Sequence, residues 1–313
     1  MTSKPIVLIV LFITLVINGA CVAATPVATI ASPRVTPAAL ATNISSGATP
    51  IATSASPFGH IYLIVMENSS YTDIVGNSNA PYLNSLIANY GLATNYRGVA
   101  RPSEPNYLAL FSGSTQGVAD NNNHNLDGQT IADQLEAHGK TWKVFAQNVP
   151  LDCATGETAS GGEDGAGDYA RKHEPAISFT AISAVPARCL NITDFTHFDP
   201  AAADFEFITP NLCNNMHDCS TATGDAFLRK FVPTILDSPA WQQGGLLFIT
   251  WDESEGTASN QVATLVISKA AAKGFQSAIA HDHYSLLRTI EDVWGLGCLN
   301  KTCTANNFNE FFH

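Results

Sequence analysis

The sequence predicts an α/β fold with three layers, in which helices cover both faces of a mainly parallel sheet. Its clearest strands, 61–66 and 246–251, are uninterrupted apolar runs without polar alternation. Such runs are typical of strands that are buried on both faces. Strand patterns also alternate with amphipathic helical patterns along the chain. With 45% hydrophobic and 13% charged residues, the chain has ample material for the core of one large domain, which we place at residues 57–313.

The N-terminal residues 1–24 have the pattern of a secretory signal peptide. Lys4 precedes an apolar run over 6–17, and small residues follow around a favoured cleavage site at Ala24. The apolar run is too short for a comfortable membrane span. Cys21 offers lipid attachment as the alternative, although the residues before it lack the usual large apolar side chain. The mature chain is therefore expected to be secreted or extracytoplasmic, with no transmembrane span.

Residues 25–56 consist mainly of Ala, Thr, Pro and Ser and carry a single charge, at Arg34. A segment of this composition buries too little apolar surface to offset the entropy lost on ordering. We therefore expect a flexible stalk between the signal peptide and the folded domain.

Seven cysteines are present, and six remain once the signal peptide is removed. An even number in an exported protein indicates disulfides. Short spacings favour the pairs Cys213 with Cys219 and Cys298 with Cys303, which leaves Cys153 for Cys189. A thiolate zinc site is the competing interpretation, but neither short pair has the two-residue gap typical of zinc knuckles.

Acidic and amide side chains follow the two clearest strands. Glu67 and Asn68 come after the first strand, and Asp252 and Glu253 follow the second. In a parallel sheet ligands collect outside the carboxyl ends of the strands, so these side chains are predicted to converge. Crowded carboxylates repel one another unless a cation holds them together. Oxygen ligands favour Mg, Ca or Mn as this divalent ion, and histidine participation would favour Zn or Fe.

Ser103 precedes a short helical run that ends at Gly113. This position places the hydroxyl at a helix N-terminus, where free N–H groups and the helix dipole attract an anion such as phosphate. Asn106 would lie in the first turn with its amide directed to the same place. The simpler alternative is that Ser103 only caps the helix.

Three histidines stand where they are able to serve this site. His283 lies at the entrance of an amphipathic helix, and His217 lies next to Asp218 in a loop after the strand at 205–208. A histidine at such a position supplies a metal ligand or a phosphate contact. His173 has the same potential, with a solvated surface histidine as the alternative.

Several of these runs resemble the secreted bacterial phosphoesterase family, which holds acid phosphatases and phospholipases C within the alkaline-phosphatase-like superfamily. The similar runs span 65–71, 102–113, 209–218, 250–253 and 283–291, and occur in the same order over about residues 58–298. The resemblance implies an alkaline-phosphatase-like fold and a metal-dependent hydrolase of phosphate esters with a hydroxyl nucleophile. One departure is Asn215, where relatives often have an acid, and a neutral ligand there disfavours a full second metal site.

The residues and the resemblance together assign roles. Ser103 is the nucleophile, Asn106 stabilises the phosphate oxygens, and His217 and His283 complete the phosphate site as ligands or donors. The predicted metal ligands are Glu67, Asn68, Asp252 and Glu253. The predicted substrate-binding residues are Asn106, His173 and Asp218.

A small phosphate-ester substrate or a phospholipid is the expected partner. We expect an acid phosphatase acting on phosphomonoesters, because no lipid-binding appendage is apparent, with a phospholipase C or other phosphodiesterase as the alternative. The net charge of −12 and the lack of a basic patch argue against nucleic acid. A non-catalytic surface binding protein is the remaining class, but it has no need of so complete a set of site residues.

Overall fold

The computed structural model describes residues 56–150, 152–153, 158–159 and 168–312. The expected signal peptide at 1–24, with Cys21, and the expected stalk up to residue 55 lie outside this part of the chain. Among the described residues no helix is both long and apolar enough to cross a membrane.

One large sheet forms the middle of the domain, with the strand order β10-β2-β9-β8-β1-β7-β3-β6, and β11 pairs with β2 beside it. The strands of this sheet are β1 (His60–Met66), β2 (Gly91–Arg97), β3 (Trp142–Ala146), β6 (Ile192–Thr193), β7 (Phe205–Thr209), β8 (Gly245–Trp251), β9 (Gln261–Ser268), β10 (Gln276–Ser277) and β11 (His281–Asp282). A separate hairpin pairs β4 (Thr158–Ala159) with β5 (Tyr169–Ala170).

The sheet is mixed but mostly parallel, which confirms the predicted fold class. Strand β1 runs parallel to β7 on one side and to β8 on the other, while β9 is antiparallel to both of its neighbours. Residues 61–66 of β1 and all of β8 are buried, as their unbroken apolar sequences predicted. The register pairs Met66 with Trp251, so the residues that follow these two strands leave the sheet side by side.

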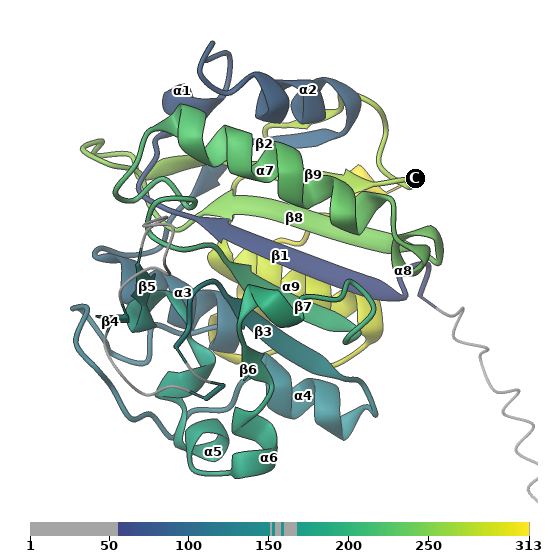
Figure 1. Ribbon diagram of the computed structural model, residues 1–313. Coiled ribbons are helices and arrows are strands. Elements are labelled where there is room, and N and C mark those ends of the chain that lie inside the picture. The colour runs from purple at the N-terminus through teal and green to yellow at the C-terminus, as the bar shows by residue number, and fades with distance from the viewer. Residues whose placement is uncertain (1–55, 151, 154–157, 160–167, 313) are drawn as a thin grey trace, which may run out of the picture. The chain divides into compact units, whose positions relative to one another are not determined.

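Helices cover both faces of this sheet, and Figure 1 shows α7 in front of the strands and α9 behind them. The α-helices are α1 (Tyr71–Ile74), α2 (Pro81–Asn89), α3 (Ser103–Ser112), α4 (Ile131–Ala137), α5 (Thr180–Ser183), α6 (Pro186–Cys189), α7 (Thr221–Leu236), α8 (Pro239–Gln242) and α9 (His283–Trp294). Short 3₁₀ helices are η1 (Arg171–His173), η2 (Ala176–Ser178), η3 (Phe195–His197), η4 (Asn300–Thr304) and η5 (Asn309–Phe311).

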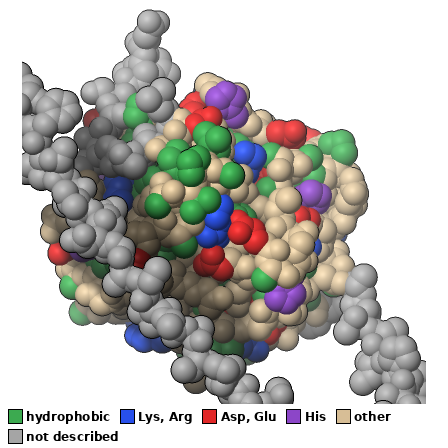
Figure 2. Space-filling view, turned by 90° about the horizontal axis from the view of Figure 1, so that it is seen from below, with side chains coloured by type: hydrophobic (Ala, Val, Ile, Leu, Met, Phe, Trp, Pro, Cys, Tyr) green, Lys and Arg blue, Asp and Glu red, His purple; other side chains and the backbone are tan. Residues whose placement is uncertain are grey.

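The three predicted disulfides are present, joining Cys153 to Cys189, Cys213 to Cys219 and Cys298 to Cys303. The second of them closes the loop between β7 and α7, which carries His217. On the face shown in Figure 2, basic side chains are few and lie among acidic ones, in keeping with the net charge of −12.

Candidate active site

The first part of the site is built by the ends of β1 and β8. Glu67 is fully buried, and its backbone N–H donates to the carbonyl oxygen of Asn215 at 2.8 Å. Asn68 adopts a left-handed conformation with a φ of 48°, and its N–H donates to Oδ1 of Asp252 at 3.1 Å. The turn after β1 is thereby tied to the turn after β8, as the parallel register requires.

Ser103 is the first residue of α3, and its side chain is directed at Glu67. Its hydroxyl donates to Oε2 of Glu67 at 3.2 Å, and the residue is only 2% exposed. One helical turn later, the Tyr107 hydroxyl donates to Oε1 of the same carboxylate. Pro102 occupies the N-cap position and the helix has no side-chain cap, so the alternative that Ser103 is only a cap is wrong. The serine oxygen instead lies at a buried carboxylate beside the helix N-terminus.

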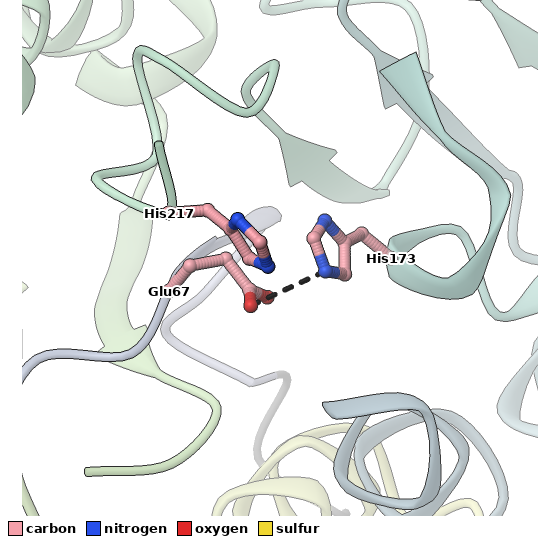
Figure 3. A group of neighbouring side chains, drawn as sticks. All are labelled: Glu67, His173 and His217. Atoms are coloured by element: carbon pink, nitrogen blue, oxygen red, sulfur yellow. Dashed lines mark ion pairs between the residues drawn. The ribbon is translucent and has the colours of Figure 1, made fainter. Parts of the chain in front are cut away.

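The side chains of two histidines point toward the Glu67 carboxylate, as Figure 3 shows. His173 ends η1 and His217 lies in the loop after β7; each of the three side chains offers one ligand atom, and these atoms lie within 4.8 Å of one another. We call Glu67, His173 and His217 the histidine cluster. The Nε2 atom of His173 is 3.2 Å from Oε2 of Glu67 but is not aligned for a hydrogen bond. This buried nitrogen without a hydrogen-bond partner fits a metal ion.

The ring of His217 is held from both ends. Its Nδ1 lies 2.6 Å from Oδ1 of Asp218, and its Nε2 lies 3.2 Å from the ammonium nitrogen of Lys172. Because a carboxylate only accepts and an ammonium only donates, Nδ1 carries the proton and Nε2 offers a lone pair. Asp218 therefore orients His217 through Oδ1, and its contact with substrate stays a prediction.

A second group of side chains, the carboxylate cluster, consists of Asp252 and Glu253 with Asn68. Oδ2 of Asp252 is buried without a hydrogen-bond partner, and the Asn68 side chain has none within the part of the chain that the structure describes. Glu253 lies 3.4 Å from the guanidinium of Arg101. Glu67 connects this cluster to the histidine cluster, because its charge helps to raise the pKa values of Asp252 and Glu253 while its carboxylate shares the 4.8 Å set with the two histidines.

The carboxyl groups of both clusters have raised pKa values. Burial raises the pKa of Glu67, opposed chiefly by the Tyr107 hydrogen bond, and burial with the nearby Glu67 charge raises the pKa of Asp252 far above its usual range. Burial and Asp252 raise the pKa of Glu253 to about 7, against the pull of Arg101. A divalent cation would stabilise the ionised forms of these crowded groups. Together with the unpaired Oδ2 of Asp252, this electrostatic arrangement fits a metal ion.

His283 differs from the prediction that it binds metal or phosphate. It is fully buried, its Nε2 lies 2.6 Å from the backbone oxygen of Asp252, and its Nδ1 lies 2.8 Å from the Tyr96 hydroxyl. A carbonyl only accepts, so Nε2 donates and Nδ1 accepts from the tyrosine. Burial lowers the pKa of His283 to about 4, which keeps the ring neutral. Both nitrogens are used inside the protein, and His283 positions the backbone of Asp252.

Asn106 also differs from its predicted orientation. Its Oδ1 accepts from the backbone N–H groups of Val99 and Ala100, each at 2.9 Å, and its Nδ2 donates to the carbonyl oxygens of Ala100 and Pro102. These bonds use the amide to hold the turn that leads into Ser103. The predicted direct contact of Asn106 with phosphate is replaced by a positioning role.

Known proteins are similar in sequence to this chain over most of its length. The model of the Phosphoesterase family matches residues 76–297. A Mycobacterium tuberculosis protein named phosphatidylinositol-3-phosphatase is 34% identical over 253 residues, which cover 80% of each chain. The chain belongs to the Phosphoesterase family. An acid phosphatase from Aspergillus fumigatus is 31% identical over 263 residues, or 80% of this phosphoesterase and 58% of the fungal protein.

Solved structures show the same fold at low sequence identity. A protein of the alkaline phosphatase superfamily from Vibrio parahaemolyticus aligns with a TM-score of 0.53 and 10% identity, over 80% of this phosphoesterase and 69% of that chain. The phosphonate monoester hydrolase of Agrobacterium radiobacter aligns with a TM-score of 0.52 and 11% identity, over 81% of this phosphoesterase and 77% of that chain. The predicted alkaline-phosphatase-like fold is confirmed. As a family member the chain is a hydrolase of phosphate esters, so the non-catalytic alternative is set aside.

Sequence reasoning missed Tyr107 and Lys172 in this phosphoesterase. Tyr107 stands four residues after Ser103, and this helical spacing places both side chains on one face of α3, which is a signal that was available. Lys172 precedes His173, but no spacing rule gives the direction of side chains in a 3₁₀ helix of three residues.

Proposed function

We propose that this chain is a secreted, metal-dependent phosphomonoesterase of the acid phosphatase type, with Ser103 as its nucleophile. The observation that carries the proposal is the buried Ser103 hydroxyl, which contacts Glu67 and lies close enough to Asp252 to lower the pKa of that carboxyl group. The hydroxyl thus lies between the two clusters at a helix N-terminus, where an anion is favoured.

The residues that would hold the ion are those of the carboxylate cluster with Glu67. Their oxygens form a donor set suited to a hard divalent cation, while histidine nitrogens would favour Zn or Fe. When bound, the ion supplies positive charge for phosphate oxygens and lowers the pKa of the serine hydroxyl.

The chain's own residues then provide the steps of hydrolysis. The Ser103 oxygen forms a bond to phosphorus while the bond from phosphorus to the leaving oxygen breaks. The backbone N–H groups at the start of α3 stabilise the equatorial oxygens. Glu67, which accepts from the Ser103 hydroxyl, takes the proton that Ser103 loses and passes it to the lone pair on Nε2 of His217. His217, oriented by Asp218, then gives this proton to the leaving oxygen, and water afterwards releases phosphate from Ser103. His173 contributes its unpaired nitrogen to the same phosphate site, and Asn106 and His283 position the groups around it.

Phosphomonoesters are the proposed substrates because the relatives bear phosphatase names. The Mycobacterium tuberculosis protein is named for a phosphoinositide, and the fungal proteins are named acid phosphatases. We therefore propose small phosphate monoesters, with a monophosphorylated lipid headgroup as a second candidate that the first relative favours. The signal-peptide pattern and the three disulfides support secretion.

The test is the substitution Ser103→Ala, assayed with p-nitrophenyl phosphate, bis-p-nitrophenyl phosphate and a phosphoinositide in vesicles. We expect kcat to fall by about 10³-fold or more for every substrate, because the covalent step is lost. Circular dichroism and the melting temperature check that the variant folds. Wild-type turnover by a folded variant would contradict the nucleophile, and preference for the diester would contradict the monoesterase proposal.

A further inference from the structure

Lys172 contacts the histidine cluster through His217. It is the middle residue of η1, is half-buried, and its ammonium nitrogen lies 3.2 Å from Nε2 of His217. Its positive charge lowers the pKa of Glu67 and of Glu253, so it lies within electrostatic range of both clusters. Within the described part of the chain, no carboxylate forms an ion pair with Lys172.

The contact with His217 has a direct consequence for metal binding. Asp218 accepts the proton on Nδ1, so the lone pair of His217 is on Nε2, the atom that faces Lys172. A metal ion at the histidine cluster needs this same lone pair. An ammonium group and a divalent ion at one nitrogen would also repel each other strongly in a site with little water.

Asn215 gives an independent reason why a second ion is disfavoured here. Its Oδ1 accepts from the backbone N–H of His217 at 2.8 Å, and its Nδ2 donates to the carbonyl oxygen of Pro210 at 3.3 Å. The side chain therefore braces the loop and offers no carboxylate to the histidine cluster. Lys172 supplies the only positively charged side chain in contact with that cluster within the described residues.

We propose that Lys172 is a built-in cation of the histidine cluster, which keeps a divalent ion away from His217 and binds a phosphate oxygen of the substrate in its place. This inference rests on the proposed function, since it assigns Lys172 to the same phosphate site. One ion then binds at the carboxylate cluster, and the lysine provides the second positive charge that a dianionic phosphate group needs beside Ser103.

The experiment counts metal ions per chain by mass spectrometry, after equilibration with Zn²⁺ or Mn²⁺ and removal of free ion. Lys172→Met is expected to raise the count by one relative to wild type, and Lys172→Met with His217→Asn is expected to return it to the wild-type number. Lys172→Arg keeps the positive charge and should leave the count unchanged. Lys273→Met is the matched control, because Lys273 is exposed on the surface.

Affinity for inorganic phosphate gives a second readout, with a dissociation constant about 10-fold weaker in Lys172→Met than in Lys172→Arg. An unchanged ion count in folded Lys172→Met would overturn the inference. So would the loss of an ion from the single variant His217→Asn, which does not depend on how Lys172→Met folds. A wild-type protein without any ion would contradict the metal-dependent proposal alone, because a gain of one ion in Lys172→Met would still support the role of Lys172.

Discussion

The carboxylate cluster and the histidine cluster are built by different means, although they meet at Ser103. The carboxylate cluster follows the ends of two adjacent parallel strands. The backbone N–H of Asn68 donates to the Asp252 carboxylate, the backbone N–H of Asp252 donates to the carbonyl oxygen of Met66, and these bonds tie the two ends together. The histidine cluster takes His173 from the short 3₁₀ helix η1 and His217 from a loop that is closed by a disulfide, so both lie outside the central sheet.

This difference suggests a division of labour. Side chains on the edge of a rigid sheet hold a fixed geometry, which a tightly coordinated ion requires. Side chains on loops adjust more readily, which suits contacts with a phosphate group that enters and leaves. Changes to the carboxylate cluster should therefore remove the ion, whereas changes to the histidine cluster should alter phosphate binding and proton transfer.

The largest effect is expected for Asp252→Asn. This change removes a negative ligand while keeping the shape of the side chain, so we expect the bound ion to be lost and kcat/KM to fall by about 10³-fold. Without added metal the variant should be more stable than wild type, because a buried carboxyl group next to Glu67 is gone.

Asp225→Asn provides the matched control for this prediction. Asp225 is also buried, but its carboxylate accepts from the backbone N–H groups of Tyr82 and Leu83 at the start of α2. Its replacement should lower the melting temperature and leave the ion count and kcat unchanged. An Asp252→Asn enzyme that keeps both its ion and its activity would remove the distinction between the two clusters.

A smaller effect is expected from the histidine cluster, where His217→Asn is compared with Asp218→Asn. Loss of the ring removes the proposed proton donor, and we expect kcat to fall about 10²-fold. Loss of the Asp218 carboxylate only frees the ring from its 2.6 Å partner, and we expect a fall of about 10-fold. A comparison of two substrates provides the check. The p-nitrophenolate leaving group needs little protonation, so the His217→Asn variant should lose less activity on p-nitrophenyl phosphate than on an alkyl phosphate. Equal losses on both substrates would contradict proton donation by His217.

The same contrast explains what the sequence was able to predict. Unbroken apolar runs identified β1 and β8, and a parallel pairing of these strands necessarily brings Glu67 and Asp252 together. Cysteine spacing likewise led to the correct three disulfides. In both cases a local pattern is coupled to a simple geometric rule.

Loop geometry and hydrogen-bond direction follow no such rule. Asn106 and His283 were predicted to face the substrate, but each has its polar atoms satisfied by backbone or by Tyr96 inside the protein. Strand β2 was also missed, because its sequence mixes small, polar and aromatic residues instead of forming an apolar run. Buried polar groups must find partners, and the sequence does not state which partner each group finds.

The smallest expected effect concerns Glu206, a buried acid near the start of β7, away from the strand ends that carry the site. Burial raises its pKa to about 8, and its Oε2 has no hydrogen-bond partner. Between about pH 4.5, the ordinary pKa of a glutamic acid, and pH 8, the folded protein binds a proton that the unfolded chain has released. The free energy of unfolding therefore falls as the pH rises through this window.

Glu206→Gln removes this pH dependence without touching either cluster. We expect the stability of the variant to match wild type at pH 5 and to exceed it by about 3–4 kcal/mol at pH 8, as measured by urea unfolding of the metal-free protein. The residual slope of the variant then comes from the other carboxyl groups with raised pKa values, which are Glu67, Asp252 and Glu253 at the site and Glu104, Glu174 and Glu291 outside it. Added divalent ion should abolish only the part that comes from the site, because a cation favours the ionised carboxylates. If the variant keeps the wild-type slope of unfolding free energy against pH, Glu206 is ionised in the folded protein. If added ion leaves the residual slope unchanged, the metal binds away from the carboxylate cluster.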